Sequence, residues 1–151
     1  MKANIKQQLC LLCYEAVAQR IANAQNAIDV AKESANDDSK SSAGDKHETG
    51  RAMAQLEQEK SAIQLNESIE LKKEVEKIDF TNSAGSAQLG SLVITDKGNF
   101  FISVPIGKLN INQQTYFAVS PSSPIGMKVR NLKKNDSFDM NGLVYKILEI
   151  I

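Results

Sequence analysis

The first half of the chain repeats apolar positions with the period of a helix. The stretch 5–35 contains no proline or glycine, and its apolar residues include a 3-4-3 series typical of a helix seam: Ile21, Ala24, Ile28 and Ala31. A second run, from about 48 to 78, is rich in Glu, Lys and Gln. We expect a solvated helix there, with one apolar stripe that contains Met53, Leu56, Ile63, Ile69 and Val75.

The segment between these two runs is rich in turn-forming residues. It reads SANDDSKSSAGD and covers residues 34–45. Two helices of about 30 residues would each be roughly 45 Å long. The pattern therefore predicts a long antiparallel α-helical hairpin, a coiled coil, over residues 1–78, with its tip at about 36–48.

The period of the apolar positions changes after residue 78. Small polar residues at 79–88 predict a linker, and short alternating runs at 89–151 predict strands. Asn141-Gly142 is a hairpin signal, and Ser123 followed by Pro124 is a signal for the start of a short helix. We expect an α+β chain whose second domain is a small, strongly curved antiparallel sheet with one short helix.

Charge and hydropathy exclude several function classes. Lys+Arg and Asp+Glu balance at 18 each, so no global basic field favours nucleic acid. Residues 1–80 hold 11 basic and 14 acidic side chains, whereas residues 81–151 hold 7 and 4. The apolar run 9–13 is too short for a secretion signal, and no stretch approaches a membrane span. We therefore expect a cytoplasmic protein with no membrane partner.

Cys10 and Cys13 are the two cysteines of the chain. A zinc site would need further ligands, and the single histidine, His47, lies far along the chain. A redox dithiol usually follows a strand, and none is predicted before Cys10. We expect both cysteines to be buried apolar residues on a helix.

Several short motifs occur in an order that resembles one protein family. The tip has Gly-Asp and, after two intervening residues, Glu. The second domain opens with Leu-Gly-Ser-x-Val, and a Ser-Pro-x-Gly stretch, a basic turn and a closing tyrosine strand follow. The matching segments are Gly44–Glu48, Leu89–Val93, Ser123–Gly126, Lys133–Asp136 and Tyr145–Ile150. Together with the predicted hairpin they cover most of the chain, and the chain resembles the Gre family of bacterial transcript-cleavage factors.

The resemblance implies a transcription elongation factor that binds RNA polymerase. Its second domain would be FKBP-like and dock at the rim of the polymerase, and its hairpin would enter the secondary channel. There Asp45 and Glu48 would help to hold the polymerase's Mg²⁺ and position the water that cleaves backtracked RNA. The chain would bind no cofactor alone, would not be an enzyme by itself, and would take no small-molecule substrate.

The predicted tip and the second domain supply further candidate contact residues. The candidate tip contacts are Asp37, Asp38 and His47. For the two aspartates the alternative interpretation is solvated loop charges, and for His47 it is an exposed loop histidine. Nascent RNA in the complex is a further candidate partner. The candidate polymerase-binding residues of the second domain are Ser123, Pro124, Ile125, Gly126, Lys133 and Lys134. Lys128 and Arg130 extend the last two into a basic patch, for which a solvated surface is the alternative interpretation.

Other interpretations remain open at the tip. Asp45-x-x-Glu48 is also the pattern of a helix capping box, which needs no metal. Where the family continues with Asn-Ala-Glu-Tyr, this chain has Thr49-Gly50-Arg51-Ala52, without the second acid and the tyrosine. A Gre-like protein that occupies the channel without cleavage is therefore the first alternative.

An FKBP-type prolyl isomerase is the second alternative. That activity needs an apolar, aromatic-lined cleft. The available aromatic residues form adjacent pairs that must point to opposite faces of a sheet: Phe100 with Phe101, and Tyr116 with Phe117.

Overall fold

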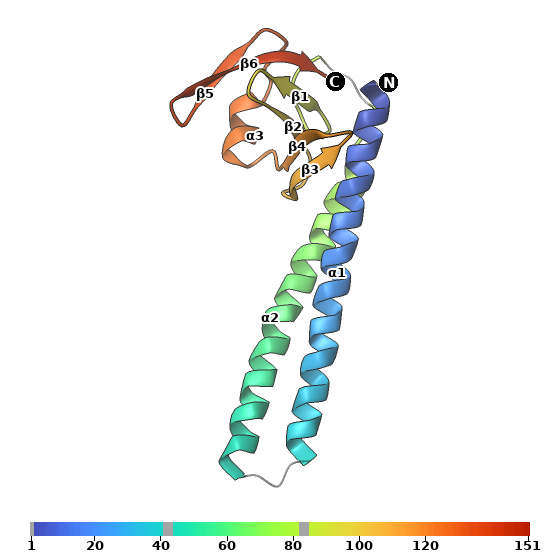
Figure 1. Cartoon of the computed structure of the whole chain (residues 1–151), viewed down its shortest axis with the longest axis vertical. Coiled ribbons are helices and arrows are strands. Elements are labelled where there is room, and N and C mark those ends of the chain that lie inside the picture. The colour runs from blue at the N-terminus through green and yellow to red at the C-terminus, as the bar shows by residue number, and fades with distance from the viewer. Residues whose placement is uncertain (1, 41–43, 82–84) are drawn as a thin grey trace. The chain divides into compact units, whose positions relative to one another are not determined.

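The computed structural model describes the backbone of residues 2–40, 44–81 and 85–151, and the side chains of residues 4–34, 49–81 and 85–151. Two long helices, α1 (Lys2–Lys40) and α2 (Gly44–Lys77), precede a sheet with one short helix, α3 (Pro124–Val129) (Figure 1). The α+β class expected from the sequence is confirmed. None of the described helices has an apolar stretch long enough to cross a membrane.

The chain divides into two compact units. One consists of Val17–Lys72, which are the middle and distal parts of both helices. The other combines Met1–Ala16 with Lys73–Ile151, so the base of each helix belongs with the sheet.

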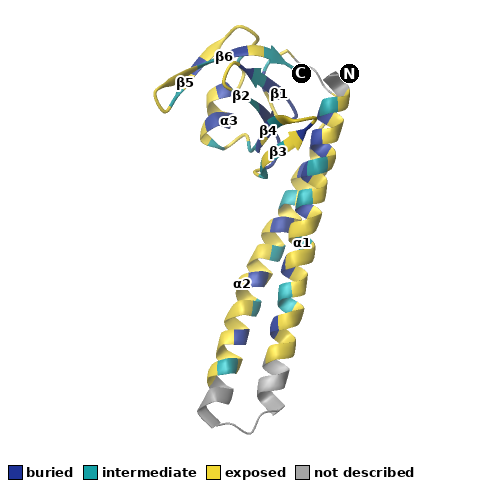
Figure 2. Cartoon of the chain, in the orientation of Figure 1, coloured by how far each residue is buried: buried dark blue, intermediate teal, exposed yellow. Residues whose placement is uncertain are grey.

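Apart from Val17, the buried positions of the helical unit hold small residues. In α1 the buried residues of this unit are seven apart: Val17, Ala24 and Ala31. In α2 they are also seven apart: Ala54, Ser61 and Ser68 (Figure 2). A seven-residue repeat keeps one face of a helix toward its neighbour, and small side chains let the two backbones come close. The expected seam of α1 is confirmed, with Ile21 and Ile28 half-buried beside it.

The expected apolar stripe of α2 is wrong except at its end. Only Val75 is buried, whereas Met53, Leu56 and Ile63 are 65%, 64% and 60% exposed. The five apolar residues lie at intervals of 3, 7, 6 and 6, which do not stay on one face of a helix. The buried face instead follows the small residues, which sequence hydropathy does not mark as a core.

The sheet of residues 92–150 has six strands in the order β3-β4-β2-β1-β6-β5. Their bounds are β1 (Leu92–Thr95), β2 (Gly98–Ile102), β3 (Gly107–Ile111), β4 (Gln114–Val119), β5 (Ser137–Met140) and β6 (Leu143–Ile150). The hairpin at Asn141-Gly142 is confirmed, because both residues have positive φ, 54° and 80°, as a type I′ turn requires.

The sheet is mixed rather than antiparallel. Strands β2 and β4 pair in parallel, with Phe100 opposite Phe117. The turn Asn112-Gln113, with φ of 51° and 67°, joins β3 and β4 in a tight hairpin, and β4 rather than β3 then lies against β2. Hydrophobic alternation identified these strands, but it carries no information about which strands become neighbours.

Both faces of the central strands are buried. On one face, Phe100 and Ile102 belong to a core with Ile125 and Val129 of α3. On the other face, Phe101 and its register partner Leu92 are both fully buried. This second face is the one from which Ser103 approaches α1.

Residues just before β1 are part of the sheet unit. Ala87 is fully buried, its amide donates to the carbonyl of Leu132 at 2.8 Å, and its carbonyl accepts from the amide of Asn131 at 2.9 Å. Ser86 forms an isolated β-bridge with Lys133. The chain therefore enters the sheet several residues before the first strand.

Candidate functional site

The acidic residues of the predicted tip lie at the end of α1 and at the start of α2, which follow each other in the sequence. Asp37 and Asp38 belong to the last turn of α1, and Asp45, His47 and Glu48 belong to the first turns of α2. Their side chains lie outside the residues whose side chains are described. The helical backbone alone places Asp45 and Glu48 on one face of α2, because residues three apart on a helix are neighbours.

The Ser-Pro-x-Gly motif forms the start of α3. Ser123 is the N-cap: its Oγ accepts a hydrogen bond from the amide of Gly126 at 3.1 Å and donates one to the carbonyl oxygen of Ser120 at 2.6 Å. Pro124 occupies the first turn, as the sequence predicted. Ile125 is 6% exposed and belongs to the core.

Gly126 is required by close packing. A Cβ at this position would overlap the carbonyl oxygen of Ser120 and lie 2.9 Å from backbone atoms of Pro121. Much of this motif thus has a structural task. Its exposed member is Pro124, and Met127, which directly follows the motif, is 62% exposed. A partner that binds at this motif would contact these two side chains.

Two lysines stand on the turn that follows α3. Lys133 and Lys134 are exposed, and the Asp136 carboxylate accepts a hydrogen bond from the Lys133 amide at 2.8 Å. Asn135 has a φ of 76°, which closes the turn and returns the chain toward β5. Lys128 and Arg130 are also exposed, so the turn and α3 together present four cationic side chains to solvent.

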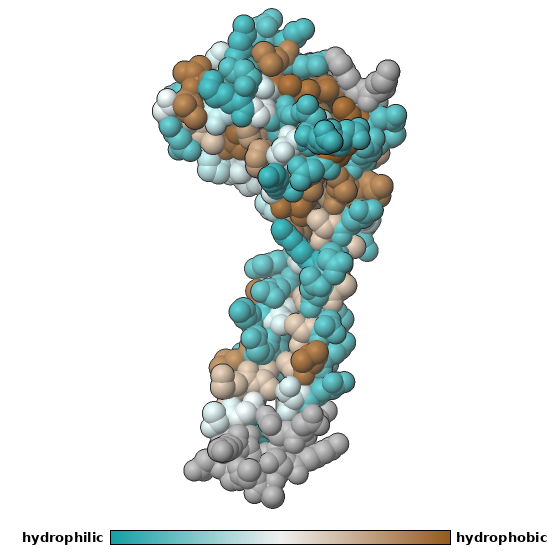
Figure 3. All heavy atoms as spheres, viewed as in Figure 1, coloured by the Kyte–Doolittle hydropathy of each residue, from teal (hydrophilic) through white to brown (hydrophobic). Residues whose placement is uncertain are grey.

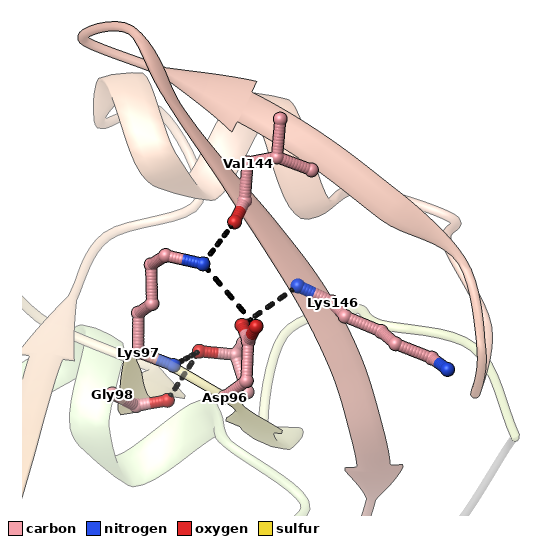
Figure 4. A network of polar contacts seen from close by, with 6 residues as sticks. Asp96, Lys97, Gly98, Val144 and Lys146 are labelled. Carbon is pink, nitrogen blue, oxygen red and sulfur yellow. Dashed lines mark hydrogen bonds and ion pairs between the residues drawn. The ribbon is translucent and has the colours of Figure 1, made fainter.

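A polar network between the β1–β2 turn and β6 was not predicted from the sequence (Figure 4). The Asp96 carboxylate accepts from the Lys146 amide at 2.9 Å and lies 3.2 Å from the Lys97 ammonium. Lys97 also donates to the Val144 carbonyl oxygen and lies 5.8 Å from the centre of the Tyr145 ring. The hydrogen bond from Lys146 is the main cause that lowers the pKa of Asp96 below its usual value.

Cys10 and Cys13 are buried free thiols at the base of α1, as the sequence predicted. Burial raises the pKa of the Cys13 thiol to about 11 and also raises that of Cys10. Because the thiolate is the reactive form, these cysteines are poor nucleophiles and poor metal ligands at neutral pH.

An apolar hollow of about 480 Å³ is lined in part by Cys10. Leu11 and Tyr14 of α1 and Phe80 after α2 contribute to its walls. Tyr14 donates a hydrogen bond of 2.5 Å to Glu76, and this bond raises the pKa of the phenol. No local sequence signal marks this hollow, since its walls come from segments more than 60 residues apart.

Among the side chains at 4–34, 49–81 and 85–151, no three or more His, Cys, Asp or Glu residues are grouped so that they could hold a metal ion. The aromatic residues considered for an isomerase cleft are mostly in the core: Phe101 is fully buried, and Phe100 and Tyr116 are 8% and 6% exposed.

Comparisons of the chain with models of protein families, with curated proteins and with solved structures find no match.

Proposed function

We propose that the chain is a Gre-like transcription elongation factor that binds RNA polymerase and stimulates the cleavage of backtracked RNA. In this proposal α1 and α2 form a coiled-coil hairpin that enters the secondary channel, and the sheet unit is FKBP-like and docks at the rim. The protein works in the cytoplasm and supplies ligands to the polymerase's own Mg²⁺. It is not an enzyme by itself.

One observation carries the proposal: acidic residues cluster where two helices of 39 and 34 residues succeed each other in the chain. Helices of these lengths are roughly 50 to 60 Å long. Their buried positions hold small residues such as Ala24 and Ala54, which keeps a pair of helices thin. A long, thin probe with hard oxygen ligands at its end suits delivery of carboxylates to a metal inside another protein.

The sheet unit adds a second line of support. The Leu-Gly-Ser-x-Val segment enters β1, the Ser-Pro-x-Gly segment starts α3, and the tyrosine segment is β6. These segments match the resemblance in order, and each belongs to a distinct part of one folded unit. Polymerase contact is assigned to the exposed side chains near α3, which are Pro124, Lys133 and Lys134.

The test is RNA cleavage in stalled, backtracked elongation complexes of a bacterial RNA polymerase. Wild type is compared with Asp45→Asn/Glu48→Gln, and the matched control is Glu59→Gln/Glu67→Gln, which removes the same charge from exposed positions farther along α2. We expect the wild type and the control to shorten the transcript, and the tip variant to bind polymerase without cleavage.

Two other outcomes separate the alternatives. If wild type and tip variant both bind polymerase and neither cleaves, the protein is a channel occupant and Asp45 and Glu48 serve as a helix cap. If neither binds, the Gre-like function is wrong. The buried positions of Phe100, Phe101 and Tyr116 argue against a prolyl isomerase, and a protease-coupled peptide isomerisation assay with the same protein checks this directly.

A further inference from the structure

The apolar hollow that Cys10 helps to line lies at the base of the two long helices. Its described lining residues come from α1, from the end of α2 and from the chain that follows: Gln7, Cys10, Leu11, Tyr14, Val75, Glu76, Ile78 and Phe80. All of them belong to the compact unit that combines Met1–Ala16 with Lys73–Ile151. Figure 3 shows apolar side chains gathered around the base of the helices and mostly polar ones farther along both. The walls of the hollow are therefore fixed by one folded unit.

The size and the lining of the hollow suit a small ligand. Its volume of about 480 Å³ lies within the range of roughly 300 to 1,000 Å³ that is typical of ligand sites. Its α1 wall runs from Gln7 to Tyr14, which is roughly 10 Å of helix. Leu11 on this wall is 59% exposed, whereas Val75 and Ile78 are buried. A ligand with an apolar body would cover Leu11 and gain from its removal from water.

Glu76 is the charged residue among the described lining residues. The Tyr14 hydroxyl donates a hydrogen bond to one of its carboxylate oxygens, Oε1, and a carboxylate has further lone pairs for a ligand. Within the described part of the chain, no cationic side chain forms an ion pair with Glu76. The lysines of the last two turns of α2 do not line the hollow: Lys72, Lys73 and Lys77. The hollow therefore presents a negative charge that a cationic ligand would neutralise.

The end of α2 also favours a cation. Because α2 ends at Lys77, Glu76 lies in its last turn, where the helix dipole favours cations and opposes carboxylates. Tyr14 and Phe80 add two aromatic rings to the lining, and the face of an aromatic ring attracts a cation. The carboxylate, the helix end and the rings thus all favour the same sign of charge.

We propose that this hollow binds a small organic cation, an ammonium ion with an apolar body. Its nitrogen pairs with the Glu76 carboxylate, and its apolar part covers Leu11 between the two aromatic side chains. A small hydrophilic cation would gain nothing from these apolar walls, and an apolar anion would be repelled by Glu76. The cation is a bound ligand and not a substrate. The proposal does not depend on the transcription function.

Amide chemical shifts of the full, isotope-labelled chain test the site by titration. The probe is phenethylammonium, and its comparison is hydrocinnamate, which has a similar apolar body and the opposite charge. We expect phenethylammonium to shift the amides of Leu11, Tyr14 and Phe80 with a Kd on the order of 1 mM, as suits a ligand of this size. Hydrocinnamate is expected to bind at least about tenfold more weakly, because its carboxylate meets that of Glu76.

Two variants separate the charge in the hollow from the general charge of the helix end. Glu76→Gln keeps an oxygen that can accept the Tyr14 hydrogen bond but removes the charge, so we expect it to weaken phenethylammonium by about tenfold. Glu74→Gln is the matched control, because it removes an exposed carboxylate from the same turn outside the lining. It is expected to bind both probes as the wild type does.

A third variant tests the apolar wall. Leu11→Ser is expected to weaken both probes, since it removes the exposed apolar side chain that either body would cover. Circular dichroism confirms that each variant keeps its helix content.

Three results overturn the proposal. The first is the lack of saturable shifts at Leu11, Tyr14 and Phe80 with up to about 20 mM phenethylammonium. The second is equal affinity for hydrocinnamate, which would mean that the hollow does not select a cation. The third is a Glu76→Gln variant that binds phenethylammonium as tightly as Glu74→Gln does. None of these results bears on RNA cleavage, so the transcription proposal stands or fails separately.

Discussion

The Cys13 thiol lies 3.8 Å from the Ser103 hydroxyl, within the range of a sulfur hydrogen bond, although 90 residues separate them in the sequence. Cys13 is fully buried and Ser103 is 2% exposed. The contact joins α1 to the chain just after β2, on the face of the sheet opposite α3. The base of the first helix is therefore a structural part of the sheet unit. Substitution of Cys13 measures how much this contact contributes to the free energy of unfolding.

The raised pKa of Cys13 makes the folded state sensitive to alkaline pH. The thiol has a pKa of about 11 in the folded protein and an ordinary value near 9. Between these values the unfolded chain loses the proton while the folded chain keeps it, so the free energy of unfolding falls as pH rises. A difference of about two pKa units corresponds to roughly 2 to 3 kcal/mol.

Urea unfolding of wild type and Cys13→Ala at about pH 8 and about pH 10.5 measures this effect. We expect the wild type to lose more stability than the variant between the two pH values. Cys10→Ala is the comparison for the neighbouring thiol, whose pKa is also raised by burial. An equal loss in wild type and Cys13→Ala would show that the Cys13 thiol is not protected in the folded protein.

Asp96→Asn is expected to destabilise the protein at neutral pH and to matter less in acid. The Lys146 amide and the Lys97 ammonium hold the pKa of Asp96 below its ordinary value near 3.8. A carboxyl group with a lowered pKa contributes stability above its unfolded pKa, and this contribution is lost as pH falls through the folded pKa. The difference in thermal midpoint between wild type and variant should shrink as pH falls from about 7 to about 3.

Asp139→Asn is the control for this comparison, because it removes an exposed carboxylate from the neighbouring strand β5. A difference for Asp96→Asn that stays the same in acid would mean that the substitution acts through packing and not through charge.

Gly126→Ala is expected to destabilise the sheet unit by about 1 to 3 kcal/mol, because the added methyl group overlaps the Ser120 carbonyl oxygen. Gly142→Ala is the matched control. A Cβ added at residue 142 would have no atom within 4 Å, but Gly142 has a φ of 80°. The cost of Gly142→Ala is therefore backbone strain of about 1 to 2 kcal/mol. Urea unfolding should rank Gly126→Ala as the more damaging of the two, and the reverse order would mean that α3 can shift away from residue 120.

The elements that the sequence predicted best depend on local chemistry. Asn141-Gly142 specifies its hairpin through two positive φ angles, and Ser123-Pro124 specifies the start of α3 through a cap and a fixed φ. Both signals act within four residues. The parallel pairing of β2 with β4 depends instead on which strand of the β3–β4 hairpin packs beside β2. No short segment of the sequence determines this choice.

The surfaces that were not predicted from the sequence are formed by segments far apart in the chain. Lys97 donates a hydrogen bond to the Val144 carbonyl oxygen, 47 residues away in the sequence, and Tyr14 donates one to Glu76, 62 residues away. Hydropathy also misplaced the buried face of α2, because Ala54 and Ser61 are the buried residues there and Leu56 is exposed. The roles of Asp45 and Glu48 stay predictions, since they concern a metal that another protein would hold.

The small size of Ala24 is expected to be essential for the packing of α1. Ala24 is 4% exposed in the series that also contains Val17 and Ala31. Isoleucine adds three carbon atoms at this buried position, and overpacking of a buried site costs about 1 to 3 kcal/mol. Ala22→Ile is the matched control, because Ala22 is exposed and two residues away on the same helix. Its cost is limited to the lower helix propensity of isoleucine, about 0.4 kcal/mol.

Circular dichroism at the helix band, followed during thermal unfolding, compares the two variants. We expect Ala24→Ile to lower the midpoint clearly and Ala22→Ile to leave it nearly unchanged. Equal midpoints would mean that the helices separate readily enough to admit the larger side chain. The proposed channel probe would then be thicker than the small-residue seam implies, and the argument that the helix pair can reach a metal inside a narrow channel would lose its physical basis.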